Sequence, residues 1–292
     1  MANIYRIIDF PVFINLIENR VEWYSKPFSW EDTYEGYWYR KLNNEEQVHK
    51  TVEFFFNKVS IDNSEGTLKN VFKLWWARYN CFGQCWSKQE ESDALWRIYS
   101  YDKKSVQIRT TDIQLEEIAS KFADDFSYTI DDVKYDLDYN NLEKIQSLNM
   151  DINQRSIEPF FHKRLCFFHE EEKRIILTKK GISGFYFKVL AINTMFHAKN
   201  RPDFNSNMTR EDWLKILSEE AYKTIQSENN IFSDSEKGYL LKISKEYNLS
   251  DYITGVRVNP FAEDYFVNLV KSVCKKNGLE FLGKSEMYAV VK

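Results

Sequence analysis

Glycine and proline are scarce in this chain, which has 9 Gly and 5 Pro among its 292 residues. Together they reach less than half of the roughly 12 % that is average for proteins. We therefore expect neither the G-x-G-x-x-G fingerprint of a dinucleotide-binding fold nor the G-x-x-x-x-G-K phosphate loop. A nucleotide bound by this chain would have to be held by side chains rather than by a glycine-lined backbone cradle.

Cysteine is scarce as well, with 4 residues in the whole chain. This is too few for a disulfide framework in a chain of this length, so we expect free thiols. Zinc-ligand residue types do occur in Cys81-x-x-x-Cys85 and in His162-x-x-x-Cys166-x-x-His169. On a strand, however, His169 would point away from His162 and Cys166, and a second cysteine pair is absent from the sequence. We expect no metal site.

Long apolar runs and a basic arm are also missing. The N-terminus lacks an apolar signal core, and no run approaches the roughly 18 to 20 residues of a membrane span. The 40 Lys and Arg residues are scattered among 44 Asp and Glu residues, which gives a net charge of −4. This balance gives no reason to expect non-specific binding to duplex nucleic acid, although it is compatible with a local basic groove. We expect a cytoplasmic protein with no membrane partner.

What the chain has in excess is aromatic residues, with 22 Phe, 18 Tyr and 8 Trp. Helical spacing is clearest from Thr67 to Tyr79, where apolar residues recur every three or four positions. Short strands are interspersed with helices without strict alternation, which predicts an α+β fold with a mixed or antiparallel central sheet flanked by helices. We expect a single domain over residues 1–292 with a helical insertion at about 200–250.

Individual elements follow from apolar periodicity and capping residues. Strands are expected over 4–10, 21–24, 81–87, 105–109, 128–138, 160–177, 185–192 and 253–258, and after Gly278. Helices are expected from Pro11, over 45–59, 67–79, 93–99, 112–122 and 141–153, after Thr209, after Glu236 and from Asn259-Pro260. The many charges in 128–138 indicate an edge strand.

The strongest candidate for chemistry is the segment 162–174, which reads HKRLCFFHEEEKR. On a strand, Glu170, Glu172 and Arg174 would project from one face. Neighbouring carboxylates raise the pKa of one of the two, while an adjacent arginine lowers the pKa of both. Such a pair can bind ribose hydroxyls or stabilise a cationic sugar transition state. The alternative is a solvated edge strand with alternating charges.

A second candidate is the aromatic segment that begins at Trp86-Ser87 and continues as Ser92-Asp93-x-x-Trp96-x-x-Tyr99. Trp96 and Tyr99 share one face of the expected helix. Rings in such positions can stack on a base or on a nicotinamide ring. In a chain this rich in aromatic residues, they can equally belong to the core.

With these motifs the chain resembles the bacterial family called domain of unknown function 2971, over roughly residues 4–260. Four segments carry the resemblance: Tyr5-Arg6-Ile7, the acidic loop Trp30-Glu31-Asp32-x-x-Glu35, the aromatic segment from Trp86 to Tyr99, and Phe167-x-x-Glu170-x-Glu172-x-Arg174. The order of parts is also similar to that of toxin-type ADP-ribosyltransferases, which have a basic first strand, a serine or aromatic second element and a Glu-x-Glu strand. This similarity implies an ADP-ribosyltransferase-like fold with NAD as the substrate.

The resemblance also implies roles for the candidate residues. Glu172 would stabilise the oxocarbenium-like transition state as nicotinamide leaves, and Glu170 would orient the acceptor. Proteins of this kind look like parts of toxin or phage-defence loci, which implies a nucleic-acid or protein acceptor. The residues that would bind NAD are Tyr5, Arg6 (at the pyrophosphate), Ser87, Trp96 and Tyr99 (at the nicotinamide ring) and Arg174.

Two other functions stay open at this point. The first is a non-catalytic nucleotide-sensing or protein-interaction module, with ion pairs among Glu170, Glu172 and Arg174 and a recognition pocket lined by Trp30, Trp96 and Tyr99. The second is a metal-dependent nuclease, whose metal ligands and lysine would come from Asp32, Glu170, Glu172 and Lys163.

Overall fold

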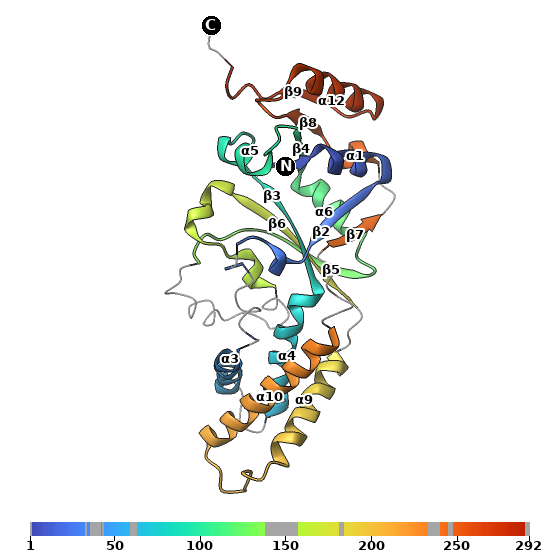
Figure 1. Ribbon diagram of the computed structural model, residues 1–292. Coiled ribbons are helices and arrows are strands. Elements are labelled where there is room, and N and C mark those ends of the chain that lie inside the picture. Colours follow the sequence, from blue (N-terminus) through green and yellow to red (C-terminus); the bar gives the residue numbers. More distant parts are fainter. Residues whose placement is uncertain are drawn as a thin grey trace.

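The computed structural model describes residues 2–32, 34–35, 42, 44–58, 63–137, 157–180, 184–232, 240–244 and 248–289. It consists of a β-sheet with covering helices and, below the sheet in Figure 1, a bundle of long helices. The bundle contains α3 (Glu45–Lys58), α4 (Ser64–Asn80), α9 (Gly184–Lys199) and α10 (Arg210–Phe232). Helix α4 links the two parts, because it continues directly into strand β3 (Cys81–Ser87).

The described strands form one sheet in the order β5-β6-β3-β1-β4-β8-β9, and β2 pairs with both β3 and β7. The pairing of β8 with β9 is parallel and the other described pairings are antiparallel, so the sheet is mixed and the predicted α+β class is confirmed. Strand β5 lies at an edge, as its charges indicated. The strands besides β3 are β1 (Asn3–Asp9), β2 (Val21–Ser25), β4 (Ser105–Thr111), β5 (Phe126–Asp132), β6 (Glu172–Lys179), β7 (Leu240–Ser244), β8 (Gly255–Val258) and β9 (Phe281–Lys284).

Local signals in the sequence set the ends of several helices. The Ser92 side chain accepts a hydrogen bond from the Leu95 amide and caps α5. Thr209 and Asp212 cap α10 reciprocally, since each side chain accepts from the backbone amide of the other. The remaining helices of the sheet region are α1 (Phe10–Asn19), α5 (Asp93–Tyr99), α6 (Asp112–Ser120), α11 (Leu249–Tyr252) and α12 (Asp264–Lys276).

The apolar core follows the same division into two parts. One cluster packs the sheet against α1, α6 and α12, and includes Ile8, Trp86 and Ile175. A second cluster fills the bundle and contains the stripe predicted on α4, with Phe72 and Trp75 fully buried. A third, smaller cluster lies between the two parts, where Ala77 of α4 packs with Phe160 and with Ile176 of β6, so the bundle supports the sheet from below.

Four predictions of local structure are wrong. Residues 185–192 belong to helix α9, which packs against α4 and α10 and also carries apolar residues on its exposed side, Phe185, Ile192 and Phe196. The stretch 160–177 is not continuously extended: η4 (Glu158–Phe161) and η5 (Leu165–Glu170) are 3-10 turns, and β6 begins at Glu172. Residues 240–244 form a strand rather than a helix, and α12 begins at Asp264 rather than at Asn259. The helix expected over 141–153 lies outside the described residues.

The expectation that the phosphate-loop pattern is missing is also wrong. Residues 278–285 read GLEFLGKS and fit G-x-x-x-x-G-K-S. A phosphate loop connects a strand to a helix, whereas this segment follows helix α12 and contains strand β9. Lys284 Nζ donates to the Ala262 carbonyl, and Ser285 Oγ donates to Glu91. Both polar groups are therefore engaged within the chain, and the pattern lacks the context of a phosphate site.

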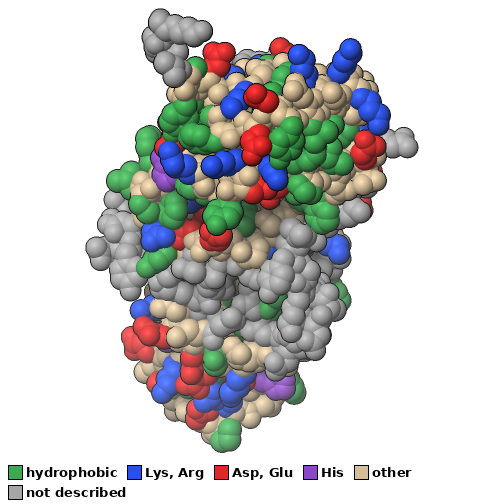
Figure 2. All heavy atoms as spheres, turned by 45° about the horizontal axis from the view of Figure 1, so that its top comes forward, with side chains coloured by type: hydrophobic (Ala, Val, Ile, Leu, Met, Phe, Trp, Pro, Cys, Tyr) green, Lys and Arg blue, Asp and Glu red, His purple; other side chains and the backbone are tan. Residues whose placement is uncertain are grey.

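Three features of the structure can be compared with the composition: the distribution of surface charge, the hydropathy of the helices and the state of the cysteines. On the face shown in Figure 2, Lys and Arg side chains lie among Asp and Glu side chains and form no basic arm. Within the described ranges, every helix is too short or too polar to cross a bilayer. The four cysteines are free thiols, as predicted.

Candidate functional site

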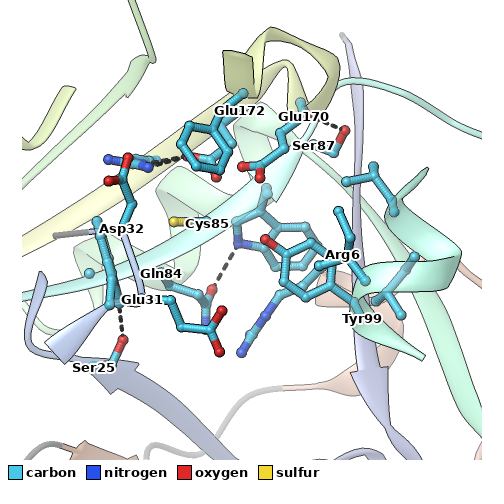
Figure 3. A pocket seen from close by; sticks show the side chains of 18 of the residues that line it. Arg6, Ser25, Glu31, Asp32, Gln84, Cys85, Ser87, Tyr99, Glu170 and Glu172 are labelled. Atoms are coloured by element: carbon cyan, nitrogen blue, oxygen red, sulfur yellow. Dashed lines mark hydrogen bonds and ion pairs between the residues drawn. The ribbon is translucent and has the colours of Figure 1, made fainter. Parts of the chain in front are cut away.

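A cavity of about 640 Å³ is lined by residues of strands β1, β2 and β3, helix α5, the segment 29–32 with Glu35, and the segment 163–174. Strand β3 pairs with β1 at Ser87 and Tyr5, and with β2 at Gly83 and Ser25. Residues 84–86, between these two pairs, all contribute to the cavity lining, so the cavity lies where β3 separates from β1 and β2. Its volume falls within the roughly 300–1,000 Å³ of ordinary small-molecule sites. Figure 3 shows the side chains that surround it.

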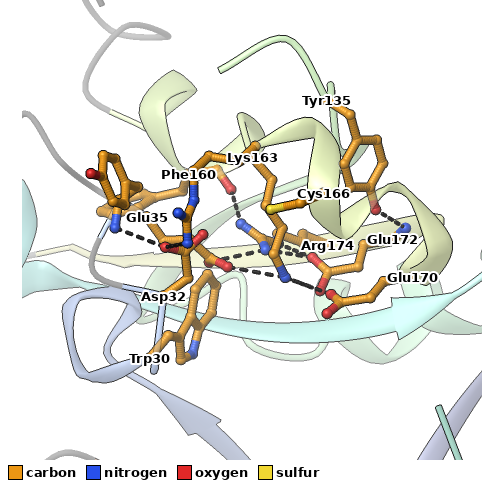
Figure 4. A network of polar contacts seen from close by, with 12 residues as sticks. Trp30, Asp32, Glu35, Tyr135, Phe160, Lys163, Cys166, Glu170, Glu172 and Arg174 are labelled. Carbon is orange, nitrogen blue, oxygen red and sulfur yellow. Dashed lines mark hydrogen bonds and ion pairs between the residues drawn. The ribbon is translucent and has the colours of Figure 1, made fainter. Parts of the chain in front are cut away.

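Five charged side chains form a buried network along one wall of this cavity (Figure 4). Lys163 Nζ lies 3.2 Å from Glu35 Oε1 and 2.5 Å from Glu170 Oε2. The same ammonium lies 3.1 Å from Glu172 Oε1. Arg174 is fully buried, donates from Nε to Glu172 Oε2 at 2.6 Å and approaches Glu35 Oε2 at 2.9 Å. Two cations thus hold three carboxylates together at the cavity.

The two carboxylates of the Glu-x-Glu pair have opposite tendencies to ionise. Burial and the hydrogen bond shared with Glu172 raise the pKa of Glu170. Burial alone would raise the pKa of Glu172 too, but Arg174, Glu170 and Lys163 together lower it. Burial also raises the pKa of Glu35. The surroundings thus favour the ionised form of Glu172 and the protonated form of Glu170, an arrangement that assigns different chemical roles to two like groups.

The chain brings Glu170 and Glu172 together by a turn, and the predicted strand alternation is wrong for this pair. Glu170 is the last residue of η5, and Glu171 adopts a left-handed conformation with φ 40° and ψ 55° before β6 starts. Glu172 then lies opposite Ser87 in the β3–β6 register, and Arg174 lies opposite Cys85. Because paired residues of antiparallel strands share a face, these four side chains lie on one side of the sheet.

The structure brings most of the predicted site residues together. Trp96 is the exception, because it is buried away from the cavity lining and its indole donates a 3.1 Å hydrogen bond to Glu91. Arg6 keeps 19 % of its side chain exposed and pairs with Glu22 at 3.2 Å. The predicted residues that line the cavity are Tyr5, Arg6, Ser87, Tyr99, Glu170, Glu172 and Arg174.

Sequence reasoning missed several residues of the cavity. Gln84 donates to Glu22 at 2.7 Å and accepts from Trp86 Nε1 at 2.8 Å, so it orders the wall beneath Arg6. Lys163 was predicted only as a nuclease lysine, and Glu35 only as part of an acidic loop. A signal for Lys163 was that the two motifs together contain five carboxylates and one arginine, because buried carboxylates require further cations.

The argument from strand parity against a zinc site is wrong, although the segment is well explained without a metal. Residues 165–170 form a 3-10 turn, so strand parity does not apply to Cys166 and His169. His162 is buried, with Nδ1 2.6 Å from Asp136 and Nε2 2.9 Å from Glu158. Among the residues that the structure describes, no group of three or more His, Cys, Asp or Glu side chains is arranged to hold a metal ion.

Comparison with known proteins gives no relative: no family model, no curated protein and no solved structure matches the chain. The resemblances drawn from the motifs therefore stay predictions, and the function has to be argued from the cavity itself.

Proposed function

We propose that the chain cleaves NAD at this cavity, as an ADP-ribosyltransferase or an NAD hydrolase. One observation carries the proposal. Arg6, Ser87 and Glu172 come from the adjacent strands β1, β3 and β6 and line a single cavity. The similarity to toxin-type ADP-ribosyltransferases rests on three parts in this chain order: a basic residue, a serine and a Glu-x-Glu pair. The similarity is one of arrangement, so the function has to come from the chemistry of the residues.

The ionised Glu172 suits the bond-breaking step. When the bond between nicotinamide and the ribose C1′ breaks, its electron pair leaves with nicotinamide and positive charge develops on the ribose. A carboxylate fixed by Arg174 and Lys163 opposes that charge without reorganising, and burial strengthens the interaction. The hydroxyl of water or of an acceptor then bonds to C1′ and releases its proton to solvent. Glu170 lies on the same wall and would orient that hydroxyl.

Aromatic and basic side chains of the cavity suit the rest of the substrate. Arg6 would bind the pyrophosphate, since its guanidinium lines the cavity and is partly exposed there. Its ion pair with Glu22 orients the guanidinium. Tyr99 lines the cavity from α5 and would stack on the nicotinamide ring. A nucleic acid or a protein would serve as the acceptor in the transferase reaction.

One observation favours a second function, binding without turnover. Lys163 and Arg174 contact both carboxylate oxygens of Glu172, an arrangement that also suits a rigid nucleotide-sensing module. A nuclease is less well supported, because the Lys163 ammonium lies among the carboxylates where a divalent cation would have to bind. Asp32, the remaining candidate ligand, is held by Arg164 at 2.9 Å.

Nicotinamide release separates these functions. The purified chain is incubated with NAD, and nicotinamide is quantified by chromatography for the wild type, Glu172→Gln and the control Glu171→Gln, whose side chain does not line the cavity. Loss of the ionised carboxylate should lower the rate on the order of 100-fold or more, while the control keeps it. Thermal unfolding with NAD verifies that each variant folds and binds. Equal rates for the two variants would exclude catalysis by Glu172, and binding without release would favour the sensing module.

A further inference from the structure

Arg6 lies apart from the five charged residues of the buried network, in another part of the same cavity. In Figure 3, Arg6 and Gln84 lie below Glu170 and Glu172. Gln84 points to the opposite side of β3 from Ser87, since side chains alternate along a strand, yet both residues line the cavity. The cavity reaches both sides because β1 and β2 separate from β3 here. A ligand that contacts both Arg6 and the carboxylates must therefore be elongated, as a dinucleotide is.

The guanidinium of Arg6 is held by a buried side chain that is not part of the cavity lining. Arg6 Nη1 donates to Glu22 Oε2 at 3.2 Å, and the Glu22 side chain is only 3 % exposed. Among the described residues, Glu22 is the single ion-pair and hydrogen-bond partner of Arg6. A guanidinium has five N–H donors, so this contact leaves several of them for a ligand in the cavity.

Glu22 is fixed in turn by the amide of Gln84, which is buried. Gln84 Nε2 donates to Glu22 Oε2 at 2.7 Å and to the Trp23 carbonyl at 3.1 Å. On its other side, Gln84 Oε1 accepts from Trp86 Nε1 at 2.8 Å. These partners determine the orientation of the amide, because its NH₂ group meets two acceptors and its oxygen meets a donor. A carboxylate at this position would repel Glu22, and an apolar side chain would leave it without this donor.

Trp86 closes the ring of contacts. Its indole lies beside the same guanidinium, with Arg6 Cζ 5.9 Å from the ring centroid. The indole is itself buried and packs edge-on against Tyr252 at 6.0 Å. Arg6 is thus held by a carboxylate and by an aromatic ring, and both are joined to Gln84. A long side chain that is ordered before a ligand binds loses less conformational entropy on binding.

We propose that Gln84 is a positioning residue, which holds Arg6 through Glu22 and Trp86 as the subsite for a phosphate group of the ligand. The ordered N–H groups of a guanidinium match the oxygens of a phosphate. The inference rests on the proposed function, under which this phosphate belongs to the pyrophosphate of NAD. Because Gln84 acts through Arg6, its replacement should weaken the binding of ligands that carry phosphate and spare those that do not.

Calorimetric titration with NAD and with nicotinamide riboside, which has no phosphate, tests this selectivity. Gln84→Met keeps the length of the side chain and removes its hydrogen bonds, so it should lower the affinity for NAD on the order of 10-fold and leave that for the riboside unchanged. The matched control is Gln107→Met. Gln107 is equally buried and also lines the cavity, but its amide donates to the Glu90 carbonyl at 2.7 Å, so the ratio of the two affinities should stay.

A double-mutant cycle separates positioning from a general defect of the wall. Arg6→Met removes the guanidinium, and Gln84→Met in that background should cause no further loss of NAD affinity. A full additional loss, or an equal loss for NAD and the riboside in Gln84→Met, would overturn the inference.

Gln84→Glu is a second variant of nearly the same shape, in case Gln84→Met does not fold. Its ionised form repels Glu22, whereas its protonated form can donate as the amide does. Relative to the wild type at the same pH, its NAD affinity should therefore recover as the pH falls. A pH-independent loss would contradict the role of the donor.

The two proposals can fail separately. Nicotinamide release without an effect of Gln84 on the affinity ratio would overturn this inference alone. A ratio that depends on Gln84 without any release would overturn the proposed function alone. If the wild type binds neither ligand, both are wrong.

Discussion

Ser87 lies directly opposite Glu172 in the β3–β6 register, and its hydroxyl donates a 2.7 Å hydrogen bond to the backbone carbonyl of Glu170. One serine thus fixes both members of the Glu-x-Glu pair, the second through the strand register and the first through its own side chain. Its oxygen also accepts from the Gln89 amide at 3.0 Å. Ser87 is therefore a positioning residue for the two carboxylates, and its two hydrogen bonds contribute to the stability of the folded chain.

Replacing Ser87 by alanine removes these two hydrogen bonds. We expect Ser87→Ala to lower the free energy of unfolding by about 1 kcal/mol, and to lower kcat for nicotinamide release while KM changes little. The matched control is Ser127→Ala, because Ser127 lies on the edge strand β5 and donates to the backbone carbonyl of Thr178 on β6 at 3.4 Å. Chemical denaturation and steady-state kinetics measure the two effects. If kcat falls equally in both variants, Ser87 does not position the carboxylates.

The buried network makes Arg174 critical for stability. Arg174→Met would leave the Glu172 carboxylate buried with one cation fewer, and breaking a buried ion pair in this way costs about 3–5 kcal/mol. Arg97→Met is the control, since Arg97 is 62 % exposed and pairs with Asp93 one helical turn away. Such surface pairs contribute little to stability, because solvent screens them. Urea denaturation should show a large loss for the first variant and a small one for the second; similar losses would contradict the network.

Glu170 should make stability depend on pH. Burial and the neighbouring Glu172 raise the pKa of Glu170 from its usual 4.5 to about 8. The folded chain then holds a proton that the unfolded chain releases, so this contribution is complete below about pH 4.5 and is lost as the pH rises towards 8. In Glu170→Gln the side chain is neutral at every pH. The fall in melting temperature between pH 5 and 8 should be smaller than in the wild type by a few degrees.

Scanning calorimetry at several pH values measures this difference. Glu171→Gln serves as the control, because it alters the adjacent residue outside the cavity lining and should keep the wild-type profile. A Glu170→Gln profile parallel to that of the wild type would mean that Glu170 is ionised in the folded chain.

Gly83 sets the position of the Trp30 ring. In Gly83→Ala the new Cβ would lie 2.7 Å from Trp30 Cζ2 and 2.9 Å from Ile176 Cδ1, so both side chains would have to move. We expect a loss of about 1–3 kcal/mol in stability, together with weaker binding of NAD. The double variant Gly83→Ala, Trp30→Phe should recover part of the stability, because the smaller ring removes the clash. Strictly additive losses in a double-mutant cycle would show that the two residues do not interact.

Much of the sheet region could be predicted from local signals. Ser92 marks the start of α5, and in the bundle the apolar stripe of α4 reaches Tyr79, one residue before the helix ends. These signals depend on residues close in sequence, as does the strand Cys81–Ser87, which was predicted with its correct limits. The helix α9 was missed because its exposed positions Phe185, Ile192 and Phe196 are apolar as well, so the sequence lacks the polar face that would show a helical period.

The site was predictable by residue type but not by geometry. Glu170, Glu172 and Arg174 are close in the sequence, and their motif singled them out. Lys163 and Glu35 join them only because η5 and the acidic loop fold back onto the sheet, a tertiary relation without a local signature. The same is true of Trp96, which shares a helix with Tyr99 and yet packs against another part of the chain.

The backbone of Glu171, between the two acidic residues, has a left-handed conformation that restricts which residue types can stand there. Side chains branched at Cβ strongly disfavour this conformation, whereas glycine and asparagine accept it. The same two glutamates separated by valine or isoleucine would continue as a plain strand, without the turn that places Glu170 ahead of β6. Two proteins can therefore share Glu-x-Glu in their sequences and differ in the shape that it encodes. Among chains that carry this motif, the identity of the middle residue indicates whether the two carboxylates meet across a turn or follow one another along a strand.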